Sequence, residues 1–158
     1  MKAELFSVGT EILLGHITDT NAPYLAQQLS ILGIDLYWIS QVGDNLGRLT
    51  EALQRAWQRS DLIVITGGLG PTEDDLTREG ITALLGEEML VDPDLERDLR
   101  QFFVSRGYEM PERNIKQATL VASARAIPNP IGTAPGWFVQ RDGRIGVHLM
   151  RGFASGRV

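Results

Sequence analysis

Apolar residues follow two different spacings along the chain up to residue 86. Apolar, mostly β-branched runs predict strands at 3–8, 34–42 and 62–66. Amphipathic spacing predicts helices at 21–32, 46–59 and 76–85. The resulting β-α-β-α-β-α order indicates an α/β fold with a mostly parallel sheet and helices on both faces. Such sheets bind ligands beyond the carboxyl ends of their strands, which here are followed by residues 9–11, 43–45 and 67–75.

The pattern changes after residue 86. An apolar stripe made of Leu95, Leu99, Phe102 and Phe103 predicts a helix at 92–106 that faces a core. A short helix is expected at 112–118, followed by a proline- and glycine-rich loop at 129–136. Strands at 137–140 and 145–150 flank the turn pair Asp142-Gly143, which is a strong hairpin signal. We therefore expect a C-terminal β-hairpin.

The composition narrows the class of protein. The chain has 158 residues, 43% hydrophobic and 22% charged, as expected for one globular domain. Its net charge of −5 argues against nucleic acid as a partner, because nucleic-acid binders usually display a basic face. The same charge favours small-molecule ligands. No apolar run approaches the length of a membrane span. The absence of cysteine excludes disulfides and thiolate metal ligands and agrees with a cytoplasmic location.

The segment 65–79, ITGGLGPTEDDLTRE, carries the main candidate chemistry. It joins a buried strand to a glycine turn whose N–H groups could bind one phosphate. The expected phosphate-binding residues are Thr66, Gly67, Gly68, Leu69 and Gly70. The acids at 73–75 follow directly, and carboxylates beside an anion site indicate a bridging divalent cation. The alternative is a tight strand-to-helix connection in which Asp74 or Asp75 caps the next helix.

Five ordered motifs carry a family resemblance. They are GTEILLGHITDTN (9–21), VGDN (42–45), TGGLGPTEDDLTRE (66–79), NIKQA (114–118) and NPIGTAPG (129–136). Together they resemble the N-terminal domain of the CinA, or competence-damage inducible, proteins. That domain is similar to the molybdopterin-binding proteins MogA and MoaB. The resemblance implies a three-layer α/β/α fold, a single domain over 1–158, and assembly into dimers or trimers.

The resemblance also implies a chemistry. In the molybdenum-cofactor relatives, the acids that match Asp44 and Asp75 are tied to metal-assisted adenylyl chemistry on molybdopterin. In CinA proteins the domain is associated with hydrolysis of the pyrophosphate of ADP-ribose. A further C-terminal domain of that family deamidates nicotinamide mononucleotide, and we expect it to be absent from this chain. Asp44 and Asp75 are therefore the candidate catalytic residues, and a divalent ion such as Mg²⁺ is the expected cofactor.

Several candidates keep a second interpretation. Asp44 could instead cap the helix at 46–59, for which Asn45 is also a cap candidate. Glu11 could bind the metal or only cap a turn. Lys116 is either a phosphate contact or a solvated charge. Thr133 and Gly136 either allow close approach of a phosphate or ribose to the backbone or form a rigid turn. His16 and His148 are isolated, and we expect them to be structural or exposed.

Three functions stay open. The leading one is metal-dependent hydrolysis of a nucleotide-sugar pyrophosphate such as ADP-ribose. The second is a molybdopterin-binding protein of molybdenum-cofactor biosynthesis, and the third is a non-catalytic binding module. The chain departs from the family at its end, where 151–156 reads RGFASG in place of Pro-Gly-x-Pro-x-Glu-Met. That departure leaves open whether the chain is a fragment, a divergent paralogue or a product with an altered terminus.

Apolar side chains in the C-terminal half bear on assembly. Leu99, Phe102, Phe103 and Trp137 exceed what one small sheet is expected to cover, and an apolar patch of that size usually meets a partner. The alternative is that they fill the core of the monomer. With the resemblance, the first interpretation predicts a homo-oligomer.

Overall fold

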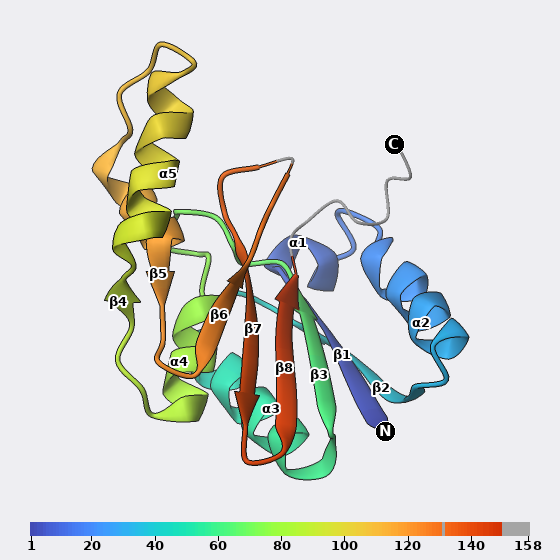
Figure 1. The fold of residues 1–158 in the computed structure, drawn as a ribbon. Coiled ribbons are helices and arrows are strands. Elements are labelled where there is room, and N and C mark those ends of the chain that lie inside the picture. The colour runs from blue at the N-terminus through green and yellow to red at the C-terminus, as the bar shows by residue number, and fades with distance from the viewer. Residues whose placement is uncertain (131, 150–158) are drawn as a thin grey trace.

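A six-stranded sheet with the order β2-β1-β3-β8-β7-β6 is the centre of the computed structural model, which describes residues 1–130 and 132–149 (Figure 1). The main-sheet strands are β1 Lys2–Val8, β2 Asp35–Val42, β3 Leu62–Thr66, β6 Ala124–Ile127, β7 Gly136–Arg141 and β8 Arg144–Leu149. The helices are α1 Thr10–Leu13, α2 Asn21–Ile31, α3 Leu46–Arg59, α4 Thr77–Leu85, α5 Pro93–Val104 and the 3₁₀ helix η1 Glu112–Ala118. Two further strands, β4 Leu90–Val91 and β5 Thr119–Leu120, form a small separate pair.

Strand direction confirms the mostly parallel sheet. Strand β1 pairs in parallel with β2 and β3, and β3 pairs in parallel with β8. Strands β6 and β7 complete the sheet with antiparallel pairings. The expected hairpin is the β7–β8 pair, and its turn residues Asp142 and Gly143 have φ of 52° and 75°, as a type I′ turn requires. Met150 and the divergent segment 151–156 lie outside the described residues.

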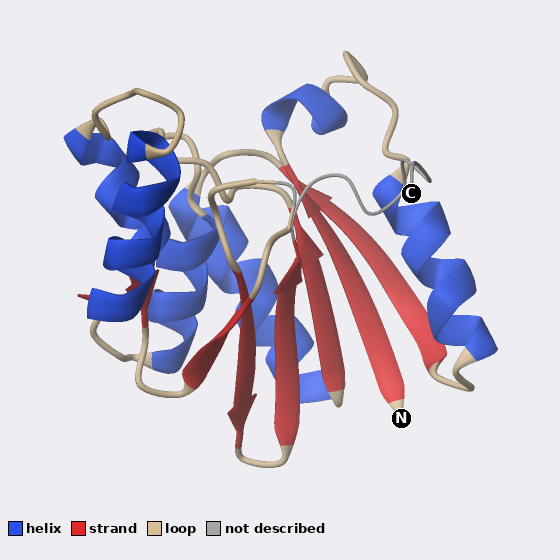
Figure 2. Ribbon diagram, turned by 45° about the horizontal axis from the view of Figure 1, so that its top comes forward, coloured by secondary structure: helices blue, strands red, loops and turns tan. Residues whose placement is uncertain are grey.

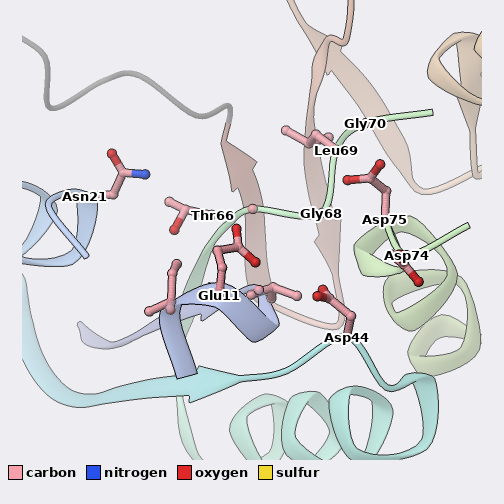
Figure 3. A pocket seen from close by; sticks show the side chains of 13 residues that line it. Glu11, Asn21, Asp44, Thr66, Gly68, Leu69, Gly70, Asp74 and Asp75 are labelled. Atoms are coloured by element: carbon pink, nitrogen blue, oxygen red, sulfur yellow. The ribbon is translucent and has the colours of Figure 1, made fainter. Parts of the chain in front are cut away.

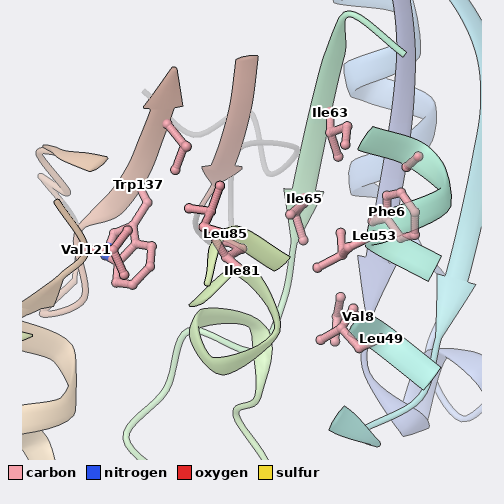
Figure 4. Packing of buried hydrophobic residues seen from close by; sticks show 12 residues of the cluster. Phe6, Val8, Leu49, Leu53, Ile63, Ile65, Ile81, Leu85, Val121 and Trp137 are labelled. Carbon is pink, nitrogen blue, oxygen red and sulfur yellow. The ribbon is translucent and has the colours of Figure 1, made fainter. Parts of the chain in front are cut away.

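Helices cover both faces of the sheet, which confirms the three-layer α/β/α arrangement (Figure 2). On one face, Leu25 and Leu29 of α2 pack against alternate residues of β1 and β3. On the other face, α3 and α4 pack against residues of β1, β3 and β7 in the larger core cluster (Figure 4). Alternation along β1 explains the division, because Leu5 faces α2 whereas Phe6 faces α3.

The C-terminal apolar side chains fill the protein's own interior. Trp137 is fully buried, and its indole N–H donates to the Thr119 carbonyl at 3.0 Å. Leu99 is 5% exposed and packs with η1, while Phe102 and Phe103 are half-buried. The apolar-patch argument for a homo-oligomer is therefore wrong for Trp137 and Leu99. No helix in the described residues is long and apolar enough to cross a membrane.

The helix starts decide between the cap candidates. Asn45 caps α3 by accepting a hydrogen bond from the Arg48 N–H at 3.0 Å, so Asp44 is not the cap. Helix α4 begins at Thr77 after Leu76, without a side-chain cap, so neither Asp74 nor Asp75 has that role. Acidic side chains that cap no helix therefore lie beside the carboxyl ends of β2 and β3.

Candidate functional site

A pocket of about 420 Å³ lies where the parallel strands β1, β2 and β3 end (Figure 3). Its lining includes the candidate metal-binding and phosphate-binding residues expected at the ends of these strands. These residues are Glu11, Asp44, Thr66, Gly67, Gly68, Leu69, Gly70 and Asp75. Parallel register explains the convergence, because Val8 pairs with Val42 and Ser7 pairs with Thr66. Segments far apart in sequence therefore reach the same edge.

The glycine turn after β3 is shaped by close backbone contacts. Gly67 and Gly68 have φ of 92° and 65°, which side-chain-bearing residues rarely adopt. A Cβ on Gly67 would lie 2.0 Å from the Val8 carbonyl oxygen. A Cβ on Gly70 would lie 2.2 Å from Oδ2 of Asp75. The turn therefore needs glycine for its dihedral angles and for its approach to β1 and Asp75.

Donors behind this turn hold its carbonyl groups toward the protein interior. The Gly67 carbonyl accepts from Thr77 Oγ1 at 2.9 Å and from His148 Nε2 at 2.9 Å. The Leu69 carbonyl accepts from the Arg78 guanidinium at 3.2 Å. In a trans peptide the next N–H points opposite to the carbonyl, so the N–H groups of Gly68 and Gly70 face away from these donors. They are not donors in any hydrogen bond among the described residues.

The acidic side chains are fixed by their own hydrogen bonds. Oδ2 of Asp44 accepts from the Thr10 N–H at 2.9 Å, and the Thr10 hydroxyl accepts from the Asp44 N–H at 2.9 Å. Oδ2 of Asp75 accepts from the Thr72 N–H at 3.0 Å and from the Thr72 hydroxyl. In the described part of the chain, neither carboxylate uses Oδ1 in a hydrogen bond or ion pair. Figure 3 shows these two groups and Glu11 directed toward the pocket.

This donor set fits a hydrated magnesium ion better than a closed metal cage. Among residues 1–130 and 132–149, no three acidic or imidazole side chains come close enough to hold a metal ion. Glu11, Asp44 and Asp75 therefore do not form a ready-made three-ligand centre. Mg²⁺ usually keeps several waters and binds through one or two carboxylates together with ligand phosphates. Asp44 and Asp75 would supply those carboxylates and the turn would supply the phosphate site.

Lys116 lies outside the pocket lining and supports it. Its ammonium donates to the Thr72 carbonyl at 3.1 Å and to the Asp75 carbonyl, and it pairs with Glu79 at 2.8 Å. The side chain thus joins η1 to the acidic segment that follows the glycine turn. The direct phosphate contact expected for Lys116 is not a feature of this geometry.

Thr133 and Gly136 also lie outside the main pocket. Thr133 lines a second cavity of about 270 Å³ between α5 and the loop before β7. Gly136 is buried, and a Cβ there would lie 2.5 Å from the His148 carbonyl oxygen. Gly136 is the first residue of β7 and not part of a turn, and close packing of β7 on β8 accounts for the glycine.

Three neighbours of the site were not anticipated as functional residues. Asn21 lines the pocket at its far end from Asp75 (Figure 3) and belongs to the first motif. Arg78 and His148 lie behind the glycine turn and bind its carbonyl groups. No spacing in the sequence indicates these two contacts, because they join α4 and β8 to a turn that is distant in the chain.

His148 provides a prediction about acid stability. Burial lowers the pKa of this histidine to about 3, with the nearby Arg78 charge acting in the same direction and the bond to Gly67 opposing it. Its ordinary pKa is 6.5, so the unfolded chain binds the proton first as the pH falls. Stability from this group is therefore complete above pH 6.5 and is lost toward pH 3, by at most about 1.4 kcal/mol per pH unit.

Urea unfolding between about pH 7 and pH 5 measures this effect. His148→Gln keeps an N–H donor for the Gly67 carbonyl and removes the titration. We expect the free energy of unfolding to fall less steeply with acidity in the variant than in the wild type. Equal slopes would contradict the prediction.

Comparison with known proteins places this geometry in a family. Residues 4–156 match the family described as "Probable molybdopterin binding domain". A CinA-like protein of Thermomicrobium roseum is 57% identical over 145 residues, which cover 92% of this chain and 36% of the relative. A CinA-like protein of Deinococcus radiodurans is 54% identical over 140 residues, which cover 89% of this chain and 35% of the relative. The chain thus spans little more than a third of the length of these curated relatives.

Solved structures agree. The crystal structure of the CinA protein of Thermoplasma acidophilum is 33% identical and superposes with a TM-score of 0.87, covering 94% of this chain and 87% of that one. MoaB of Thermus thermophilus, at 17% identity and a TM-score of 0.61, covers 96% of this chain and 81% of its own and shares the fold. The chain therefore belongs to the molybdopterin-binding domain family and is one of its CinA-like members.

Proposed function

We propose that this chain binds a phosphorylated ligand on its glycine turn and hydrolyses a nucleotide-sugar pyrophosphate such as ADP-ribose with a divalent cation. One observation carries the proposal. The N–H groups of Gly68 and Gly70 face away from their interior-bound carbonyls, and the pocket that they line also holds the carboxylates of Asp44 and Asp75. Anion donors and cation ligands in one pocket are the combination that phosphate chemistry requires.

Each part of the pocket has a separate task in this proposal. The turn amides bind one phosphate and stabilise the negative charge that develops on it during hydrolysis. Asp44 and Asp75 hold the cation, which neutralises phosphate charge and activates water when bound. Their bonds to Thr10 and Thr72 keep both carboxylates oriented before the ligand arrives. A volume of about 420 Å³ is suitable for a small-molecule ligand.

A molybdopterin ligand is the second candidate. It is favoured by the family match over residues 4–156, whose description names that cofactor. The terminal phosphate of such a ligand would occupy the same turn, so both candidates share the phosphate site. They differ in whether ADP-ribose is turned over.

Incubation of the purified chain with ADP-ribose and Mg²⁺ tests the proposal. We expect AMP and ribose 5-phosphate to form, one water being consumed per pyrophosphate bond broken, and we expect EDTA to stop the reaction. Chromatography measures AMP, and mass spectrometry of small molecules retained on purification detects a pterin.

The remaining outcomes separate the candidates. A retained pterin without AMP formation favours the molybdopterin-binding function. Binding of ADP-ribose without turnover favours a non-catalytic module. If neither ADP-ribose nor AMP binds at about millimolar concentration, well above typical KM values, the phosphate site itself is refuted.

A further inference from the structure

Arg78 has an unusual position in the first turn of α4. The residue is 0% exposed, although arginine is rarely buried completely. Its guanidinium donates to the Leu69 carbonyl at 3.2 Å and to the Pro135 carbonyl at 3.1 Å, and more weakly to the Gln117 carbonyl at 3.5 Å. One side chain therefore joins the glycine turn, the loop before β7 and the end of η1.

The charge of Arg78 has no carboxylate in direct contact. Within the described residues, arginine–carboxylate pairs are formed by Arg55, Arg59, Arg97, Arg100 and Arg141, and Arg78 is not among them. Burial lowers its pKa to about 10, while the charges of Glu79 and Asp75 act in the opposite direction. The group is thus a cation at neutral pH. Its other partners are carbonyl groups and the ring of Trp137, whose centroid lies 5.6 Å from the guanidinium carbon. A buried cation without a carboxylate partner costs free energy, and an anion nearby would offset that cost.

The position of Arg78 relative to the pocket determines where its positive field acts. The pocket lining includes Leu69 and Gly70 but not Arg78, so the guanidinium lies behind the turn. By fixing the Leu69 carbonyl inward, it directs the Gly70 N–H outward. Its field is positive on the side where a phosphate would bind, and low-dielectric surroundings weaken that field little.

We propose that Arg78 is a positioning residue of the phosphate site, which orients the Gly70 amide of the turn and favours an anion without touching it. This inference rests on the proposed phosphate site at Gly68 and Gly70. It predicts that phosphate affinity depends on a side chain that no ligand contacts.

Titration with inorganic pyrophosphate and with AMP, in the presence of Mg²⁺, tests the inference. Backbone ¹⁵N NMR follows the amides of Gly68 and Gly70 and gives Kd. Arg78→Met removes the charge and the donors, whereas Arg78→Lys keeps the charge and one donor. Arg141→Met is the matched control, because Arg141 also donates to a carbonyl, that of Leu85 at 2.6 Å, at the opposite end of β7.

We expect Kd in Arg78→Met to rise at least ~10-fold, the factor that corresponds to about one net hydrogen bond. Arg78→Lys should show an intermediate Kd, with the Gly70 amide resonance already shifted in the free protein. Arg141→Met should bind as the wild type does. If Arg78 had only a structural role, Arg78→Met would lower the melting temperature, as Arg141→Met should, but would leave Kd unchanged.

Two results overturn the inference and differ from each other. If the wild type responds to pyrophosphate and Arg78→Met binds equally well, Arg78 has no positioning role and the phosphate site stands. If the wild-type amides do not respond, the phosphate site fails and Arg78 with it. Should Arg78→Met not fold, Arg78→Lys decides, since a wild-type Kd with unshifted amides in that variant also refutes the inference.

Discussion

Replacing Gly67 by alanine is expected to abolish pyrophosphate binding and to lower the free energy of unfolding by roughly 2–4 kcal/mol. Gly67 has a φ of 92°, and a Cβ would lie 2.0 Å from the Val8 carbonyl oxygen. Neither backbone can yield cheaply, because β1 and β3 are adjacent strands of the sheet. The turn would have to move, and the amides that follow Gly67 would lose their direction.

Urea unfolding and pyrophosphate titration measure the two effects. Gly33→Ala is the matched control, since Gly33 has a φ of 70° but nothing within 4 Å of its Cβ position. It should cost only the left-handed backbone term of about 1–2 kcal/mol and leave pyrophosphate binding intact. Equal losses in the two variants would show that the contact with Val8 is unimportant.

The long elements could be predicted because their apolar spacing is regular. Strand β3 and helix α3 begin and end where the sequence indicates. Helix α1, with four residues, and strand β4, with two, are too short to show a period. The position of β8 between β3 and β7 could not be predicted either, since it depends on pairing between segments far apart in the chain.

Most residues that line the pocket could be predicted from the sequence, whereas the residues that hold the glycine turn in place could not. Parallel strands end at one edge, so Gly9–Glu11, Asp44 and the glycine turn had to meet once the strand order was known. The residues that orient the turn by hydrogen bonding to its carbonyl groups show no such pattern. Thr77, His148 and Arg78 bind main-chain carbonyls, and any donor of suitable length could do so. Residue type alone therefore does not identify them, and Lys116 shows the same difficulty, since its ammonium binds carbonyls behind the acidic segment.

Asp75→Asn and Asp44→Asn are each expected to reduce metal-dependent turnover of ADP-ribose at least ~10–100-fold, the loss found even for groups one shell beyond a metal ligand. The fold should persist. In each variant the amide oxygen can keep the bond that Oδ2 makes to the Thr72 or Thr10 N–H, so only the charge directed to the pocket is lost. The affinity for Mg²⁺ should fall by a similar factor.

The control for these variants is Asp61→Asn. Asp61 also accepts a main-chain N–H, that of Lys2 at 2.7 Å, but it precedes β3 and lies at the opposite edge of the sheet. Asp61→Asn changes the net charge equally and should turn over ADP-ribose at the wild-type rate. Steady-state AMP formation across a range of Mg²⁺ concentrations separates the outcomes. A rate restored by high Mg²⁺ assigns the lost carboxylate to metal binding, whereas wild-type rates in both Asp44 and Asp75 variants would remove these residues from the mechanism.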